Sequence, residues 1–449
     1  MVAGLSLLLP WDTTYDPWAW IVWGREIAHL DLHTATGPSW KPLPVLFTTP
    51  FSLAGSAAPA LWLLVARAGG LLALAAAYAA GRRLAGPVAG VGAALALVLN
   101  LDLARVVWLG SSEGILVAAL LAAVERHAAG ERRAAFALGA VCGLLRPEVW
   151  PFLAAYGAWL AWRDAGSRRL VAGSGALVAF LWLAPELWGS GQLWRAAERA
   201  QHPVAGAATF APDPALEVVR RADAMLIGPV QAASLAAIAF SIASLWRGPL
   251  RARDANVLGI AALAGAWLAL VALMTTHGFS GNARYVMAPA ALICVLAGVG
   301  AARVASVIAR LVAHARLAPT LTAALASGLL AAGVVPFATG RTQALGANLG
   351  VLEYQAQMRV GLQHAVTRFG GQGAVLACGE PATEDYSVPM LAWYLNVHTD
   401  DVWLDPQPHG VVFRAAPGPK SRLDPRVGRG SRKHFRFRSG PFRVYARCG

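Results

Sequence analysis

The chain has 449 residues, of which 57% are hydrophobic and only 14% are charged. Ordinary globular proteins carry about 25% charged residues, so this composition excludes a soluble globular protein. It also excludes a disordered chain, because disordered segments have little apolar surface to bury. The net charge is nevertheless +14. Such a balance is compatible with a nucleic-acid partner, an anionic membrane surface, or the Arg-rich cytoplasmic loops of a membrane protein.

Long apolar segments recur along the chain, and a helix needs about 20 such residues to cross a bilayer. They lie at 57–80, 86–101, 111–124, 170–188, 224–246, 255–275, 285–305 and 318–337. The segment 134–162 is interrupted by Arg146, Pro147 and Glu148, and because proline breaks helices it predicts a hairpin of two short helices. Residues 1–10 are apolar but too short to span, and we interpret them as the end of a first helix. Together these segments predict an α-helical polytopic membrane protein with about eleven transmembrane helices.

Arg-rich segments orient the predicted helices. They lie at 82–83, 125–133, 163–169, 247–253 and 303–316, which fall on one side of the membrane if the helices alternate. The positive-inside rule makes that side the cytoplasm. The loop 11–56 and everything after residue 337 then lie outside. This predicts a transmembrane domain over 1–337, an extracytoplasmic soluble domain over 338–449, and a location in the cytoplasmic (inner) membrane.

The C-terminal domain is expected to be a small α/β domain. Its predicted elements are an amphipathic helix at 352–369, a short helix near 389–395, and strands at 374–378, 411–414, 435–438 and 442–446. Cys378 and Cys448 both fall in this domain, in an oxidising compartment where they are expected to form a disulfide or, alternatively, to remain free thiols. Cys142 and Cys294 fall inside predicted spans.

Most of the positive charge lies at the C-terminal end. From Arg414 onward the chain has eleven Lys and Arg residues and a single acid, Asp424. The charge therefore indicates neither a nucleic-acid partner nor mainly the positive-inside rule. Two interpretations remain open for this basic tail: contact with anionic membrane lipids or an anionic envelope polymer, or an ordinary solvated surface.

The first outer loop holds the most informative residues. Asp12 and Asp16 follow the first apolar segment, and a helix is predicted over 17–30, with proline in its favourable first position. Its residues Trp18, Trp20 and Trp23 are typical of a helix at the membrane interface. Asp16 is interpreted either as the N-cap of this helix or as a carboxylate at the outer mouth of the membrane domain.

Several short motifs together resemble the GT-C glycosyltransferases, in particular bacterial aminoarabinose transferases and protein O-mannosyltransferases. The motifs are Asp16, Arg25-Glu26-Ile27, Lys41-Pro42-Leu43-Pro44, Ser111-Ser112-Glu113, Leu144–Glu148 and Gly281–Pro289. The sequence departs from these families at two positions. Trp40 precedes Lys41 where relatives often carry an acid, and Pro17 stands where many have a second acidic residue.

The resemblance implies inverting transfer of a sugar from a polyprenyl-phosphate donor to a glycan, lipid or protein acceptor. It implies a carboxylate base, Asp16 or, as second candidate, Asp12. It also implies cations that bind the donor phosphate, which are Lys41, Arg284 and Arg146. The residues expected to contact substrate are Glu113, Arg25, Glu26 and Tyr285. Alternatives remain for three of these residues: Arg284 as an interface anchor, Arg146 as a partner of Glu148, and Glu113 as a helix-start residue or the partner of Arg105.

No Walker, dinucleotide-binding or zinc-binding pattern is present. A divalent metal is left open, with His29, His33 and His277 as possible ligands. Two other functions compete with the enzyme: a polytopic lipid or sugar transporter or flippase, and a non-catalytic envelope-assembly protein with the GT-C fold. Transporters tend to place charged residues near the membrane midplane in repeated halves, whereas the acids of this chain cluster at one outer mouth.

Overall fold

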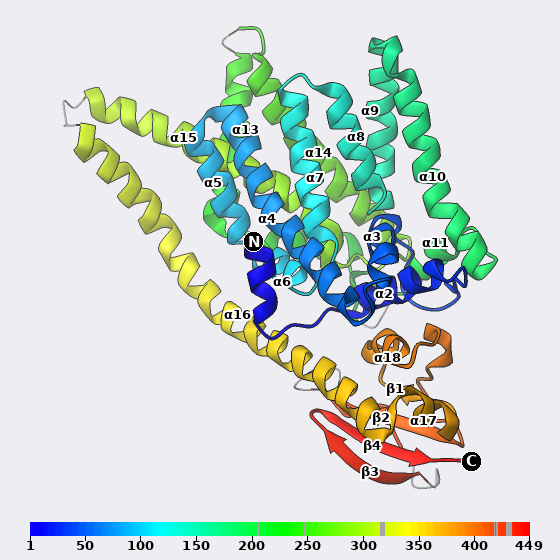
Figure 1. The fold of residues 1–449 in the computed structure, drawn as a ribbon. Coiled ribbons are helices and arrows are strands. Elements are labelled where there is room, and N and C mark those ends of the chain that lie inside the picture. Colours follow the sequence, from blue (N-terminus) through cyan, green and yellow to red (C-terminus); the bar gives the residue numbers. More distant parts are fainter. Residues whose placement is uncertain (204–205, 247, 315–318, 417, 419–420, 428–432) are drawn as a thin grey trace.

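A computed structural model describes residues 1–203, 206–246, 248–314, 321–416, 418, 421–427 and 433–449, and the helical backbone of 319–320. For residues 312–314, 319–336 and 338–339 only the backbone is described. Figure 1 shows a helical bundle with a small sheet domain at one end, joined by a long slanting helix. This arrangement has the helical membrane domain and the C-terminal sheet that the sequence predicts.

In the part of the chain that the structure describes, the bundle is built from nine main helices. They are α4 (Ala58–Ala85), α5 (Pro87–Val98), α7 (Glu113–Ala128), α8 (Arg132–Gly143), α9 (Trp150–Arg163), α10 (Arg168–Ser190), α13 (Gly228–Leu245), α14 (Ala252–Thr276) and α15 (Met287–His314). Among the described residues, five helical segments are long and apolar enough to cross a membrane. A sixth is added if α5 and α6 (Leu101–Trp108), bent by 66°, form one broken span. The chain is therefore a multi-pass membrane protein, and the number of eleven spans stays a prediction.

The predicted hairpin around Arg146 is confirmed. Helix α8 ends at Gly143, a short 3-10 helix η3 (Pro147–Val149) follows, and α9 begins at Trp150. Pro147 cannot continue the hydrogen-bond ladder of α8, which is why the chain breaks here. The break lies at the end of the bundle near the sheet domain, whereas the turns joining α4 to α5, α7 to α8 and α9 to α10 lie at the opposite end (Figure 1).

Shorter helices cover the end of the bundle that faces the sheet domain. They are α1 (Val2–Leu5), α2 (Tyr15–Ala28), α3 (Pro42–Ser52), α11 (Arg195–Ala200) and α12 (Pro214–Ala224). Trp18, Trp20 and Trp23, which are typical of a helix at the membrane interface, are at most 1% exposed, so their side chains pack inside the protein. Trp20 packs edge-on against Trp62 of α4, with ring centroids 5.4 Å apart. Helix α2 is thus a buried layer between the bundle and the C-terminal domain.

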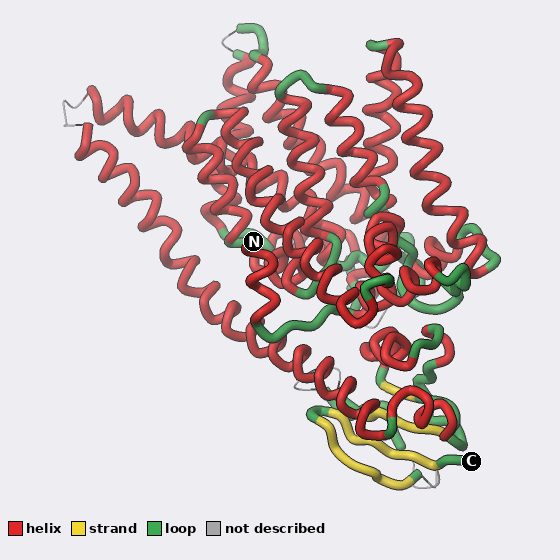
Figure 2. Tube along the Cα trace, viewed as in Figure 1, coloured by secondary structure: helices red, strands yellow, loops and turns green. Residues whose placement is uncertain are grey.

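Helix α16 (Pro319–Phe369) runs without a break through the predicted domain boundary at residue 337 and includes the predicted helix 352–369. After it come α17 (Gly371–Cys378) and α18 (Val388–Leu395), and the described residues also form a four-stranded sheet whose first strand lies between these two helices. The strands are β1 (Ala382–Thr383), β2 (Gly410–Arg414), β3 (His434–Ser439) and β4 (Phe442–Arg447), in the order β1-β2-β4-β3. Among the described strands, β1 and β2 pair in parallel, whereas β2 with β4 and β3 with β4 pair antiparallel. Figure 2 shows this sheet below the last turns of α16.

One predicted strand is wrong. Residues 374–378 belong to α17, since a short apolar run does not by itself distinguish a strand from a buried helix. The other predicted strands correspond to β2, β3 and β4. Residues Lys420, Arg429 and Arg432 of the predicted basic tail lie outside the described residues.

Two hydrophobic cores stabilise the protein. One lies among the bundle helices. The other runs from α2 into the C-terminal domain, where Trp18 and Trp20 belong to the same cluster as Leu391 and Phe413. This shared core fixes the C-terminal domain against the end of the bundle that α2 covers.

Candidate functional site

A cavity of about 690 Å³ lies between the first outer loop, the α8–α9 break, the α10–α11 region and the C-terminal domain. Five of the predicted site residues line it, which are Asp16, Lys41, Arg146, Arg284 and Tyr285. They come from four segments of the sequence, and each lies at the end of a helix or just before one. The fold therefore brings together the predicted base and all three predicted phosphate-binding cations.

Asp16 forms an ion pair rather than a helix cap. The N-cap of α2 is Thr14, so the N-cap interpretation of Asp16 is wrong, and Asp16 lies in the first turn. Its Oδ2 accepts a hydrogen bond of 2.9 Å from Nη1 of Arg284, in the 3-10 helix η6 (Ala283–Val286) before α15. Burial by itself raises the pKa of Asp16, but the charges of Arg284 and Lys41 outweigh it and the net pKa is lowered. Asp16 is therefore ionised at neutral pH.

Lys41 is the N-cap residue of α3, held at this position because Pro42 begins the helix. It is 7% exposed, and its Nζ lies 3.5 Å from Oγ of Ser112 and 4.0 Å from Oε1 of Glu113. Burial, followed by the charge of Arg146, lowers the pKa of Lys41 to about 8. A bound anion would stabilise the charged form of this amine.

Glu113 joins two of the cations. It is fully buried in the first turn of α7, and Arg146 donates a hydrogen bond to its Oε1. The interpretation that Glu113 orients Arg105 is therefore wrong. The guanidinium of Arg146 also lies 4.5 Å from the ring centroid of Tyr285, a cation–π contact. Lys41, Glu113 and Arg146 thus form one continuous buried network at the inner wall of the cavity.

The other predicted site residues do not line this cavity. Asp12 is buried, and its Oδ1 accepts hydrogen bonds from Thr13 N and Trp18 Nε1. Burial raises its pKa to about 7 despite these bonds. Asp12 is thus a structural carboxyl in this geometry, and its predicted role as a second base is not supported.

Arg25 and Glu26 fasten the C-terminal domain to α2. Arg25 donates to the carbonyl oxygens of Ala392 and Val397, at 3.4 and 2.6 Å. Glu26 Oε1 lies 2.8 Å from Nδ1 of His398. Both residues line a second cavity, of about 360 Å³, rather than the first. Their predicted substrate contacts are replaced here by contacts between α2 and the C-terminal domain.

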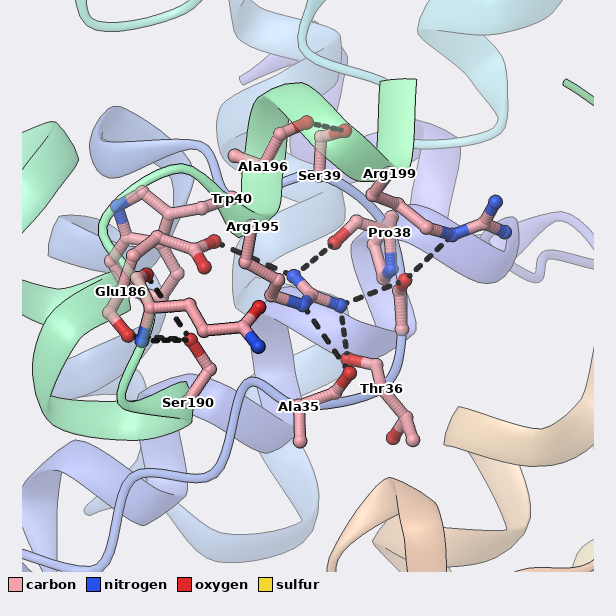
Figure 3. A network of polar contacts seen from close by, with 12 residues as sticks. Ala35, Thr36, Pro38, Ser39, Trp40, Glu186, Ser190, Arg195, Ala196 and Arg199 are labelled. Carbon is pink, nitrogen blue, oxygen red and sulfur yellow. Dashed lines mark hydrogen bonds and ion pairs between the residues drawn. The ribbon is translucent and has the colours of Figure 1, made fainter. Parts of the chain in front are cut away.

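The segment before Lys41 is held by a polar network (Figure 3). The guanidinium of Arg195 in α11 donates to four consecutive carbonyl oxygens, those of Ala35, Thr36, Gly37 and Pro38. Its Nη1 also lies 3.4 Å from Oε1 of the fully buried Glu186. Trp40 Nε1 donates to Leu181 O at 2.9 Å. These bonds hold the extended segment that ends at Lys41 against α10 and α11.

Sequence reasoning did not select several residues of the cavity wall as site residues. Glu148, Trp150 and Trp182 line it from the α8–α9 break and α10. Glu148 could have been selected from the sequence, because it belongs to the polar triplet that interrupts an apolar segment. Asp385 and Tyr386 line the cavity from the C-terminal domain, and nothing local in their sequence marks them.

Among the described residues, no group of three or more His, Cys, Asp and Glu side chains is close enough together to hold a metal ion. His33 instead pairs with Asp400 at 2.8 Å, and His277 bonds the carbonyl oxygen of Leu273. Cys378 and Cys448 form a disulfide that ties the end of α17 to the residue after β4.

Comparisons with known proteins give a fold but no sequence relatives. No protein-family model and no curated protein matches the chain. Its structure is similar to that of ArnT from Cupriavidus metallidurans in the apo state, with a TM-score of 0.55 and 16% identity, over 99% of this chain and 96% of that one. The same ArnT bound to undecaprenyl phosphate matches with a TM-score of 0.54, 14% identity and the same coverage. These matches show that the chain has an ArnT-like fold, with the helical membrane domain and the small C-terminal sheet domain described above.

Proposed function

We propose that this chain is an inverting glycosyltransferase that moves a sugar from a polyprenyl-phosphate donor to an acceptor at the outer face of the cytoplasmic membrane. The observation that carries the proposal is the pairing of Asp16 with Arg284 beside Lys41 in one cavity. An ionised carboxylate and several cations within one site are what this reaction requires.

In the proposed reaction an acceptor hydroxyl oxygen attacks the anomeric carbon of the donor sugar. A bond forms between that oxygen and the anomeric carbon, while the bond between the anomeric carbon and the phosphate oxygen breaks. Asp16 accepts the hydroxyl proton, and polyprenyl phosphate leaves as an anion. A single displacement of this kind inverts the anomeric configuration.

The cations of the cavity suit the leaving phosphate. Lys41 provides a compact positive charge, whereas Arg146 and Arg284 provide planar groups that can bind two oxygens at once. In the proposed reaction, these charges stabilise the negative charge that develops on the phosphate as its bond to the sugar breaks. The ArnT structure with undecaprenyl phosphate supports a polyprenyl-phosphate partner for a protein of this fold.

The arrangement of the chain supports an outer-face reaction. The cavity and the C-terminal domain lie at the same end of the bundle, opposite to the Arg-rich turns around Arg82 and Arg163 (Figure 1). By the positive-inside rule those turns are cytoplasmic. The acceptor, a glycan, lipid or protein, would then reach the cavity from the side of the C-terminal domain.

Sugar transfer in isolated membranes tests this function. Membranes containing the chain are incubated with radiolabelled polyprenyl-phosphate sugars, and the anomeric configuration of the product is determined by NMR. Asp16→Asn is expected to lower the rate at least about 100-fold, because it removes the base. The matched control is Asp213→Asn, since Asp213 caps α12 and asparagine caps helices equally well. Full transfer by Asp16→Asn, or no transfer by the unchanged chain from any donor, would contradict the proposal.

A further inference from the structure

Glu148 is a buried carboxylate whose hydrogen-bonding capacity is not used. It lies in η3 at the α8–α9 break, is 6% exposed and lines the main cavity. Its Oε2 has no hydrogen-bond partner among the described residues. Its Oε1 lies 4.0 Å from Nη1 of Arg146, which is too far for a hydrogen bond. A buried carboxylate oxygen left in this state is costly unless a ligand supplies a donor.

The charge of Glu148 restricts what that ligand group can be. An ionised carboxylate only accepts hydrogen bonds, and it repels a phosphate or another carboxylate. Arg146 does not satisfy it in this geometry, because its Nη2 donates to Glu113 while its Nη1 stays 4.0 Å from Oε1 of Glu148. The partner must therefore be a hydroxyl or an ammonium group.

The wall beside Glu148 is aromatic. Trp150 and Trp182 both line the cavity and pack edge-on, with ring centroids 5.6 Å apart. Their indole N–H groups both donate to the carbonyl oxygen of Gly143, at 3.0 and 2.9 Å. Since these donors are used inside the protein, the two side chains offer the cavity apolar ring surface. A sugar ring has the matching character, with C–H groups on its faces and hydroxyl groups around its edge.

We infer that Glu148, Trp150 and Trp182 form the subsite for the transferred sugar of the donor, and that it accepts neutral or amino sugars and rejects uronic acids. The inference rests on the proposed function. The donor's sugar fits better than the acceptor's, because Glu148 lies next to Arg146, one of the cations proposed to bind the donor phosphate. Trp150 and Trp182 pack on the ring, while Glu148 accepts a hydrogen bond from a hydroxyl or ammonium group.

Binding measurements on the purified full-length chain in lipid nanodiscs test this subsite. The probes are polyprenyl phosphate alone and polyprenyl phosphates carrying mannose, arabinose, aminoarabinose or glucuronic acid. The unchanged chain is expected to bind at least one neutral or amino-sugar donor more tightly than polyprenyl phosphate alone. It is expected to bind the glucuronic acid donor no more tightly than polyprenyl phosphate alone. Glu148→Gln is expected to weaken that preferred donor about tenfold or more, the size of a lost charge-assisted hydrogen bond. Its affinity for polyprenyl phosphate alone should stay within about twofold, which also shows that the variant is folded.

Glu125→Gln is the matched control. Glu125 is as buried as Glu148 and is bonded to Arg83 and Arg126. It lies near the C-terminal end of α7, whereas the cavity lies near the N-terminal end of that helix. The Glu125→Gln variant should keep the same ratio between its affinity for the preferred sugar donor and its affinity for polyprenyl phosphate alone.

Three results would overturn the inference while leaving the proposed function standing. They are an unchanged affinity of Glu148→Gln for the preferred donor, an equal loss for polyprenyl phosphate alone, and a loss confined to the acceptor's KM in transfer assays. Failure of the unchanged chain to bind any polyprenyl phosphate would overturn the proposed function and this inference together.

Discussion

Nη1 of Arg284 lies 2.9 Å from Oδ2 of Asp16, although the two residues are 268 positions apart in the chain. The contact joins the first outer helix α2 to the 3-10 helix before α15. It keeps the carboxylate ionised and places a cation beside the proposed base. The same residue pair therefore sets the charge of the proposed base and the position of one cation proposed to bind the donor phosphate.

The pH dependence of transfer should report on Lys41. Its pKa, lowered to about 8 by burial and by Arg146, keeps the amine charged below that pH and neutral above it. Since a phosphate needs the charged form, kcat/KM is expected to fall as pH rises through about 8. The lowered pKa of Asp16 places loss of the base in the acidic range. Lys41→Arg should move the alkaline limb upward, because guanidinium groups stay protonated. A limb that does not move in this variant would assign the titration to another group.

Asp12 should make stability depend on pH. Burial raises its pKa from 3.8 to about 7, so folding favours the protonated form. This contribution to stability is fully present below pH 4 and is lost as pH rises through about 7. Asp12→Asn mimics the protonated form, and its Tm relative to the unchanged chain should rise by several degrees between pH 5 and pH 8. Thermal unfolding in detergent measures this difference, and a constant difference would show that Asp12 does not titrate there.

Arg195 is predicted to be a positioning residue for Lys41. Arg195→Ala removes bonds to four carbonyl oxygens and leaves the fully buried Glu186 without its cation. It should cost about 3 kcal/mol of stability. Adding Glu186→Gln should recover most of that stability, because no unpaired charge remains. Donor KM should stay raised in the double variant, since the segment 35–38 is still unanchored. Recovery of both stability and KM would make the network purely structural.

His398 should hold the C-terminal domain more tightly at low pH. Burial by itself lowers its pKa, but the hydrogen bond and charge of Glu26, with Asp31 and Asp401, raise it overall. Because the pKa of His398 is higher in the folded protein than its ordinary value of 6.5, its protonation stabilises the contact fully below pH 6.5. This stabilisation is lost as the pH rises through the pKa of the folded state. The protection factors of the α18 amides, which are exchange rates corrected for the intrinsic base-catalysed rate at each pH, are therefore expected to be higher at pH 6 than at pH 8. His398→Gln should remove this dependence, and His29→Gln, an exposed histidine bonded only to its own helix, is the control.

Short motifs at the ends of apolar segments were enough to identify part of the site from the sequence. Asp16 and Lys41 were predictable because they match motifs of the GT-C resemblance. Arg146 and Arg284 were predictable because ionisable residues within or at the ends of apolar segments are functional by default. Arg25 and Glu26 belong to a similar motif, yet they face the C-terminal domain. Which of several neighbouring charged residues faces a cavity depends on packing against a distant segment.

The secondary structure shows the same limit. The break at Pro147 was predictable because proline acts on the local backbone. The run 374–378 was mispredicted as a strand, because so short an apolar segment fits either structure and its tertiary partners decide. The aromatic residues of α2 are typical of a helix at the membrane interface, whereas the C-terminal domain and the bundle cover them.

The sequence by itself determined that this is a multi-pass membrane protein with a basic, disulfide-competent C-terminal segment and a charged outer loop. Composition and hydrophobic length suffice for that, because a bilayer imposes the same requirement on every spanning helix. Only the tertiary structure decided that Arg284 pairs with Asp16, that Glu113 joins Lys41 to Arg146, and that one oxygen of Glu148 remains unpaired. Ion pairs and cavities depend on distances between remote segments, which no local pattern in the sequence encodes.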